Sequence, residues 1–178
     1  MFFINFLINC ISFIGIAAAP DRDGWVSVDR PDVYMEEMVE DEDGWVVFSK
    51  QIGFEKFLVR FPEDPSCRYF QEDAMELNAT QDGVIFSLKR EARGSKELKV
   101  FLSQRIEEIG VLKDAVLLRV EEKEGSIELF YRIVKGEWIR ERLIATADSF
   151  YTLQTMSSRQ QVEIHKQFAD SLVVLHLR

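Results

Sequence analysis

Cysteine and histidine are scarce in this chain, with two of each among its 178 residues. Cys10 lies in an apolar N-terminal stretch, so Cys67 is the only thiol left if that stretch is removed. One cysteine cannot close an intramolecular disulfide, and the domain must then be stabilised by its hydrophobic core. Cys67 lies beside Arg68 in a strand-like segment, and we expect it to be half-buried rather than a reactive thiol.

The two histidines, His165 and His176, have no second histidine or cysteine at the spacing of a zinc site. We interpret both as structural or surface residues rather than as metal ligands or bases. A serine nucleophile needs a neighbouring base, and the sequence indicates none for the candidate serines Ser87, Ser103, Ser149 and Ser171. The sequence accordingly predicts no catalytic, cofactor-binding or metal-binding residues, no cofactor and no enzymatic activity.

Charge is absent from residues 1–20, although the rest of the chain carries 31 acidic and 22 basic side chains. An apolar run from Phe2 to Ile16 precedes Ala17-Ala18-Ala19-Pro20, a pattern typical of a secretory signal with cleavage after Ala18. An uncleaved membrane anchor, which needs about 18 apolar residues, and a buried N-terminal helix are the alternatives. Residues 1–19 therefore predict a signal peptide or membrane anchor, and an exported protein that is periplasmic or secreted.

The net charge of −9 excludes two classes of partner. An acidic surface repels nucleic-acid backbones, and no basic face is evident in the sequence. It also repels anionic lipid headgroups, so that contact with a membrane is expected only through residues 1–19, if they are retained.

Residues 20–44 form an acidic N-terminal segment before the predicted domain. We interpret it as a solvated connector, or as a short strand or helix around Val33 to Val39 closed by an acidic turn. Asp41-Glu42-Asp43-Gly44 superficially resembles a calcium loop, but the helix-loop-helix spacing would require ligands at Val39 and Lys50. Asp43-Gly44 instead predicts a tight turn leading into a strand.

Residues 45–178 show dense strand signals and two helical patterns. Phe57, Val59 and Phe61 alternate with more polar neighbours, the period of a strand with one buried face. Strands are predicted over 45–48, 56–61, 68–70, 75–79, 84–90, 115–122, 126–134, 137–146, 150–156 and 172–177.

The first helix is predicted over 95–109, with Ser95 as N-cap and Gly110 as the C-terminal stop. The second begins at Ser158, with Gln161 as its capping-box partner. Strands grouped as hairpins favour the α+β class, an antiparallel β-sheet flanked by helices.

Two segments resemble a known family. The run from Gly53-Phe54 to Phe61-Pro62-Glu63-Asp64-Pro65 resembles the opening strand and Phe-Pro-x-x-Pro turn of PsbP-like domains. The runs Arg142-Leu143-Ile144, Phe150-Tyr151-Thr152-Leu153 and Phe168-Ala169-Asp170-Ser171-Leu172 resemble their closing strands, last helix and the start of their final strand.

The resemblance covers about residues 45–178 and implies an α-β-α sandwich around an antiparallel sheet. The superfamily includes the extrinsic photosystem subunit PsbP, a Ran-binding release factor and small exported bacterial lipoproteins. These proteins act mainly by binding other proteins and share no catalytic residues. Fold resemblance alone does not establish a function.

We therefore expect an exported, non-enzymatic accessory or adaptor protein that binds a protein partner. An exposed aromatic patch would favour this function. Its candidate members are Trp25, Trp45, Trp138, Phe54 and Tyr69, although core packing is the commoner fate of such residues. The alternative is a carrier of small apolar ligands with a pocket between helix and sheet, lined by residues such as Phe86, Phe101 and Phe130.

Overall fold

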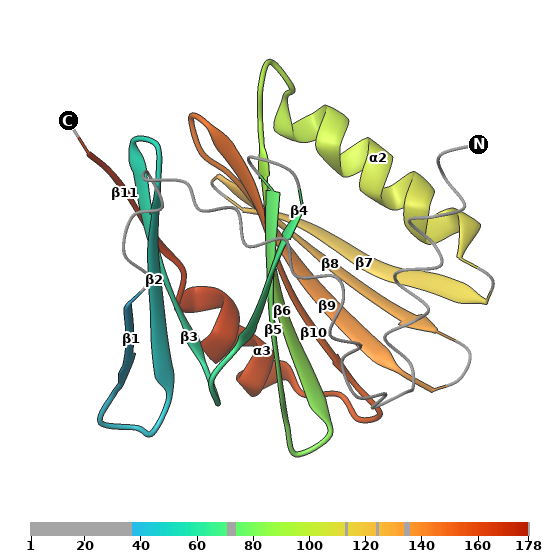
Figure 1. The fold of residues 1–178 in the computed structure, drawn as a ribbon. Helices are drawn as coiled ribbons and strands as arrows, with labels where there is room; N and C mark the ends of the chain where they lie inside the picture. Colours follow the sequence, from blue (N-terminus) through green and yellow to red (C-terminus); the bar gives the residue numbers. More distant parts are fainter. Residues whose placement is uncertain (1–36, 71–73, 113, 124, 134–135, 178) are drawn as a thin grey trace, which may run out of the picture. The chain divides into compact units, whose positions relative to one another are not determined.

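The computed structural model describes residues 37–70, 74–112, 114–123, 125–133 and 136–177 (Figure 1). All of them belong to one compact unit, Tyr34–Arg178. The predicted signal or anchor segment and Trp25 lie outside the described residues. None of the helices that the structure describes is long and apolar enough to cross a membrane.

The larger of two sheets has seven strands, and every neighbouring pair of them is antiparallel. Strands from the two halves of the chain meet at its centre, where β6 pairs with β10. In spatial order the strands are β4 (Ser66–Phe70), β5 (Ala74–Gln81), β6 (Val84–Ala92), β10 (Ser149–Ser157), β9 (Trp138–Ala145), β8 (Ser126–Ile133) and β7 (Ala115–Lys123).

A second antiparallel sheet has four strands, in the order β1 (Glu37–Glu40), β2 (Val46–Ile52), β3 (Glu55–Phe61) and β11 (Val173–His176). The prediction of one sheet is therefore corrected to two, in a mostly β fold with two helices. Pro62 and Pro65 explain the division, because proline cannot donate to a strand ladder and the chain leaves β3 for a different sheet. β1 falls inside the acidic segment 20–44, where a short strand was one of the two interpretations.

The two helices begin later than their sequence signals predict. Glu97, not Ser95, is the N-cap of α2 (Leu98–Val111), and the helix continues past Gly110. Arg93 determines the start of this helix. Its side chain donates hydrogen bonds to the carbonyl groups of Lys96 and Thr146, and so holds the residues just before the helix against the β9–β10 turn.

Helix α3 (Val162–Asp170) has Gln161 at its N-cap, and no side chain caps it. The predicted capping box from Ser158 to Gln161 is wrong, because β10 continues through Ser157, where it still pairs with β6 and β9.

The large sheet has a separate hydrophobic core on each face. Consecutive strand residues point to opposite faces, so Phe150 stacks on Phe101 of α2 while Tyr151 packs edge-on against Phe57 of the small sheet. Phe168 of α3 packs between Phe61 and Phe86 on this second face. The predicted alternation in β3 is confirmed, since every second residue from Glu55 to Phe61 is buried.

The helices cover opposite faces of the large sheet. α2 packs against β7 and β9, and α3 packs against β10 and β3 (Figure 1). The small sheet and α3 cover the second face over β5, β6 and β10, where the core residues lie. On the β7–β9 part of that face the residues that alternate outward are largely charged or aromatic, including Glu128, Phe130, Arg140 and Arg142.

Candidate functional site: an arginine-lined cleft beside helix α3

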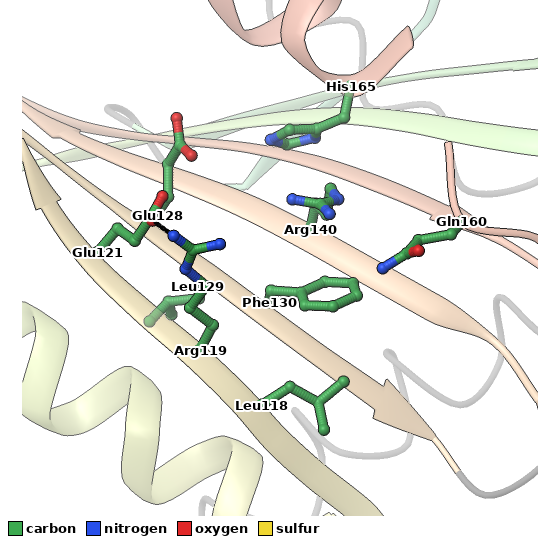
Figure 2. Close-up of a pocket in the computed structure, with 9 residues that line it drawn as sticks. All are labelled: Leu118, Arg119, Glu121, Glu128, Leu129, Phe130, Arg140, Gln160 and His165. Atoms are coloured by element: carbon green, nitrogen blue, oxygen red, sulfur yellow. Dashed lines mark ion pairs between the residues drawn. The ribbon is translucent and has the colours of Figure 1, made fainter. Parts of the chain in front are cut away.

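A cleft of about 270 Å³ lies on the β7–β9 part of this face, at the edge of α3. This volume is slightly below the usual range of small-molecule pockets, roughly 300–1,000 Å³, and suits one or two side chains of a partner. Figure 2 shows its lining residues, which are Leu118, Arg119, Glu121, Glu128, Leu129, Phe130, Arg140, Gln160 and His165.

Strand register brings the central side chains of the cleft together. Phe130 on β8 pairs directly with Arg140 on β9 and with Arg119 on β7, and paired residues share one face of a sheet. The register between β7 and β8 shifts between Leu117 and Arg119, so that both Leu118 and Arg119 line the cleft. A bulge of this kind redirects side chains in a way that a regular strand cannot.

Arg140 is the central cation of the cleft. Its guanidinium carbon lies 4.2 Å from the centre of the Phe130 ring, and its Nε is buried without a hydrogen bond to any described residue. Burial lowers the pKa of Arg140 from its usual value, and the charge of Arg119 lowers it further, against the opposing effect of Glu128 and Glu121. Arg140 forms no ion pair within the described part of the chain and is therefore a cation available to an incoming anion.

The acidic residues around Arg140 are already neutralised by other cations. Glu128 accepts hydrogen bonds from Lys123 and Arg142, each at 2.7 Å. Burial alone would raise the pKa of Glu128, but these two partners hold it below its ordinary value. Glu121 is paired with Arg119, the ion pair drawn dashed in Figure 2. Arg140 thus has no ion-pair partner of its own among the described residues.

His165 forms the α3 side of the cleft and is uncharged at neutral pH. Its Nδ1 lies 2.8 Å from Thr155 Oγ1, and the residue is 4% exposed. Burial lowers its pKa to about 4, with the nearby charges of Arg140 and Arg142 contributing to the shift. This is a structural histidine, as the sequence predicts.

A stack of aromatic and cationic side chains extends from the cleft along β8 and β9. Phe130 stacks on Trp138 with ring centres 5.5 Å apart, and the guanidinium carbon of Arg132 lies 5.0 Å from the centre of the Trp138 ring. The order along the stack is therefore Arg140, Phe130, Trp138 and Arg132. Each neighbouring pair gains from cation–π or offset-stacked contact.

The described candidates for an aromatic patch, Trp45, Phe54 and Trp138, do not lie together. Trp45 packs against Phe86, and Phe54 lies in the β2–β3 turn at the opposite end of β2. Trp138 does not line the cleft but stacks on Phe130 beside it, and the side chain of Tyr69 lies outside the described part of the chain. The three residues named for the apolar-carrier alternative lie apart: Phe86 is in the core under α3, Phe101 belongs to α2 and stacks on Phe150, and Phe130 lines the cleft.

The other predicted features are found as follows. Cys67 is half-buried on β4 against the core, as predicted. The acidic turn is held by Arg60, whose Nε lies 2.5 Å from Asp41 and whose Nη2 lies 2.8 Å from Asp43. His176, interpreted from the sequence as a structural or surface residue, is exposed and lies beside Glu55 and Asp148.

No protein-family model and no curated protein sequence matches this chain. One solved structure, a Pseudomonas aeruginosa protein of unknown function called PA94, aligns with a TM-score of 0.42 and 12% identity over 74% of this chain and 88% of that one.

Proposed function

We propose that the protein is an exported, non-enzymatic accessory protein, and that the cleft around Arg140 is where a protein partner docks. The partner segment is a polypeptide carrying Asp or Glu, whose carboxylate enters the cleft and pairs with the guanidinium group. The observation that carries the proposal is the charge of Arg140, which is half-buried over Phe130 and has no ion-pair partner among the described residues. A carboxylate there would gain a charge-assisted hydrogen bond.

The surroundings of Arg140 support docking of a protein. Tryptophan, tyrosine and arginine carry most of the binding energy at protein interfaces, and the stack around Trp138 supplies two of these residue types. Leu118 is 49% exposed at the rim, on β7, the edge strand of the large sheet. Aromatic residues and arginine are enriched at protein interfaces, and this surface presents both.

The same proposal includes membership of the PsbP-like superfamily and export. Two observations support the membership: α2 and α3 cover opposite faces of the large antiparallel sheet, and the segments that carry the resemblance fall on β3, β9, β10 and α3. The charge-free run of residues 1–19 supports export. Fractionation of the native cell with N-terminal sequencing tests it, and intact protein in the cytosol would refute it.

The docking surface is tested with a glutamate-rich synthetic peptide and its glutamine counterpart. We would follow the indole N–H resonance of Trp138 in ¹H–¹⁵N spectra, assigned with W138F. The glutamate peptide should shift this resonance saturably, and R140Q should weaken binding about tenfold, which corresponds to about 1.4 kcal/mol. The matched control is K99Q, which removes one positive charge from the exposed side of α2, on the other face of the sheet. Equal binding of the two peptides, or unchanged binding by R140Q, would refute the proposal.

A further inference from the structure

A second cluster of chemically competent side chains lies away from the cleft, where the small sheet meets the β9–β10 turn. Glu55 is the first residue of β3, and His176, the last residue of β11, is its direct partner in the register. Asp148 lies in the turn between β9 and β10. Strand pairing and a tight turn therefore bring together three residues from distant parts of the sequence.

The three side chains present ligand atoms to one point. One carboxylate oxygen each from Glu55 and Asp148 and one ring nitrogen of His176 all lie within 4.8 Å of one another. Glu55 Oε1 and His176 Nε2 are 3.7 Å apart. Ligand atoms bonded to a zinc ion at about 2.0–2.2 Å lie roughly 3–4 Å from one another, and rotation of the exposed Asp148 and His176 side chains can close the remaining distance.

Glu55 is held in place through its other oxygen. Its Oε2 accepts hydrogen bonds from Ser149 Oγ at 2.6 Å and from Tyr151 Oη at 3.2 Å, and it lies 3.9 Å from Arg90 Nη2. Burial alone would raise the pKa of Glu55, but the hydroxyls of Ser149, Thr146 and Tyr151 and the charge of Arg90 keep it below its ordinary value. The group is therefore an ionised carboxylate with one oxygen fixed.

The free oxygen of Glu55 is the independent sign of a ligand. Glu55 is 1% exposed, yet its Oε1 has no hydrogen bond with any residue in the described ranges. This is the oxygen that faces His176 Nε2. Buried carboxylate oxygens are normally paired or bind a cation, because an unpaired one loses its hydration without compensation.

We propose that Glu55, Asp148 and His176 bind a divalent transition-metal ion, with zinc as the first choice. Imidazole together with carboxylate ligands suits zinc and its neighbours, whereas calcium and magnesium take oxygen ligands alone. Three protein ligands leave a fourth position open to water or to a partner group. The ion would join β11 and β3 of the small sheet to the β9–β10 turn of the large one. Its site shares no residue with the Arg140 cleft and does not depend on it.

The test is zinc titration of the full-length protein after dialysis against a chelator. Calorimetry should show one zinc ion per chain, and Co²⁺ in its place should give the visible bands of a tetrahedral site. H176Q and D148N change exposed side chains and spare the buried Glu55, so they leave the core intact. Each should weaken zinc affinity at least about tenfold, since loss of even an outer-shell partner costs about 10–100-fold.

Three control variants show whether zinc binds at this cluster or elsewhere on the protein. E97Q removes an exposed carboxylate before α2, C67S removes the thiol on β4, and R140Q alters the cleft. All three should bind zinc as the unsubstituted protein does. The inference would be overturned if the unsubstituted protein did not bind zinc at micromolar concentration. It would also be overturned if H176Q and D148N bound zinc as tightly as the unsubstituted protein does. Either result would show that the cluster is only an ion pair between His176 and Glu55.

Discussion

Arg105 on α2 donates two hydrogen bonds to the buried carboxylate of Glu141 on β9, at 2.8 Å to Oε2 and 2.5 Å to Oε1. Tyr131 and Gln154 also donate to Oε1, at 2.6 and 2.9 Å. Burial alone would raise the pKa of Glu141, but the charge of Arg105 and these donors hold it below its ordinary value. Helix α2 is thus held to the large sheet by a buried ionic network as well as by apolar contact.

Breaking this network from one side should be costly. R105M leaves the Glu141 charge buried without a cation, and we expect a loss of about 3–5 kcal/mol in the free energy of unfolding, measured by urea denaturation. The double variant R105M/E141L should recover much of that loss, because both charges are gone. K99M, an exposed position on the same helix, is the control and should stay within about 0.5 kcal/mol. A loss below about 1 kcal/mol in R105M would contradict the prediction.

Stability should fall with acid over a window defined by His165. Its pKa is lowered from 6.5 to about 4 in the folded protein, so between these values the unfolded state binds more protons. The contribution of the neutral imidazole is present above about pH 6.5 and declines as the pH falls to about 4, where about 3 kcal/mol has been lost. H165N should abolish this part of the pH dependence. Urea denaturation from pH 4 to 8 measures the difference in slope, and parallel curves would show that His165 is not responsible.

Two phenylalanines give opposite expectations for the same substitution. Phe168 is fully buried, with its ring centre 5.2 Å from that of Phe61 and 5.4 Å from that of Phe86, so it joins α3 to both sheets. F168A should cost about 3–5 kcal/mol through lost burial and the cavity left behind. F54A, at a side chain that is 75% exposed, should change stability by less than about 0.5 kcal/mol. Similar losses in the two variants, by chemical denaturation, would show that Phe168 does not join the sheets in this way.

Alanine substitutions at two exposed glycines test the effect of backbone conformation without a steric clash. An added Cβ would have no atom within 4 Å at either Gly83 or Gly110. Gly83, with φ of 74°, forms the β5–β6 turn with Asp82, whereas Gly110 lies in α2. G83A should therefore cost about 1 kcal/mol, while G110A should stabilise by roughly 0.5–1 kcal/mol because alanine is the better helix former. Thermal unfolding of the two variants measures whether each substitution raises or lowers stability. If both changed stability in the same direction, backbone conformation would not be the deciding factor.

The local features of this fold could be predicted from the sequence because they depend on neighbouring residues. Alternation in β3, the half-burial of Cys67 and both helices follow from periodicity and turn chemistry. The ends of the helices did not follow, because Arg93 and the length of β10 determine them through tertiary contacts. The division into two sheets depends on which strands pair, a question that periodicity does not address.

The two candidate sites depend even more on long-range pairing. The cleft requires that Phe130 pairs with Arg140 across β8 and β9, and that β7 has a bulge at Leu118. No pattern of residue spacing in the sequence predicts either feature. His176 meets Glu55 only because β11 pairs with β3. The sequence shows no second histidine or cysteine at zinc-site spacing from His176, and it does not reveal that Glu55 and Asp148 lie near it in space. The one local signal for this site was Glu55, a glutamate at the start of a strand with its side chain on the buried face.

The pairing of β11 with β3 also constrains the order of events during synthesis. Val173 lies opposite Leu58, so the small sheet gains its last strand only after residues 173–176 have left the ribosomal exit tunnel. Until then one edge of β3 has no neighbour, and exposed strand edges favour intermolecular association. A nascent chain stalled before residue 173 would therefore be a natural client for chaperones, because β3 would still lack its β11 neighbour.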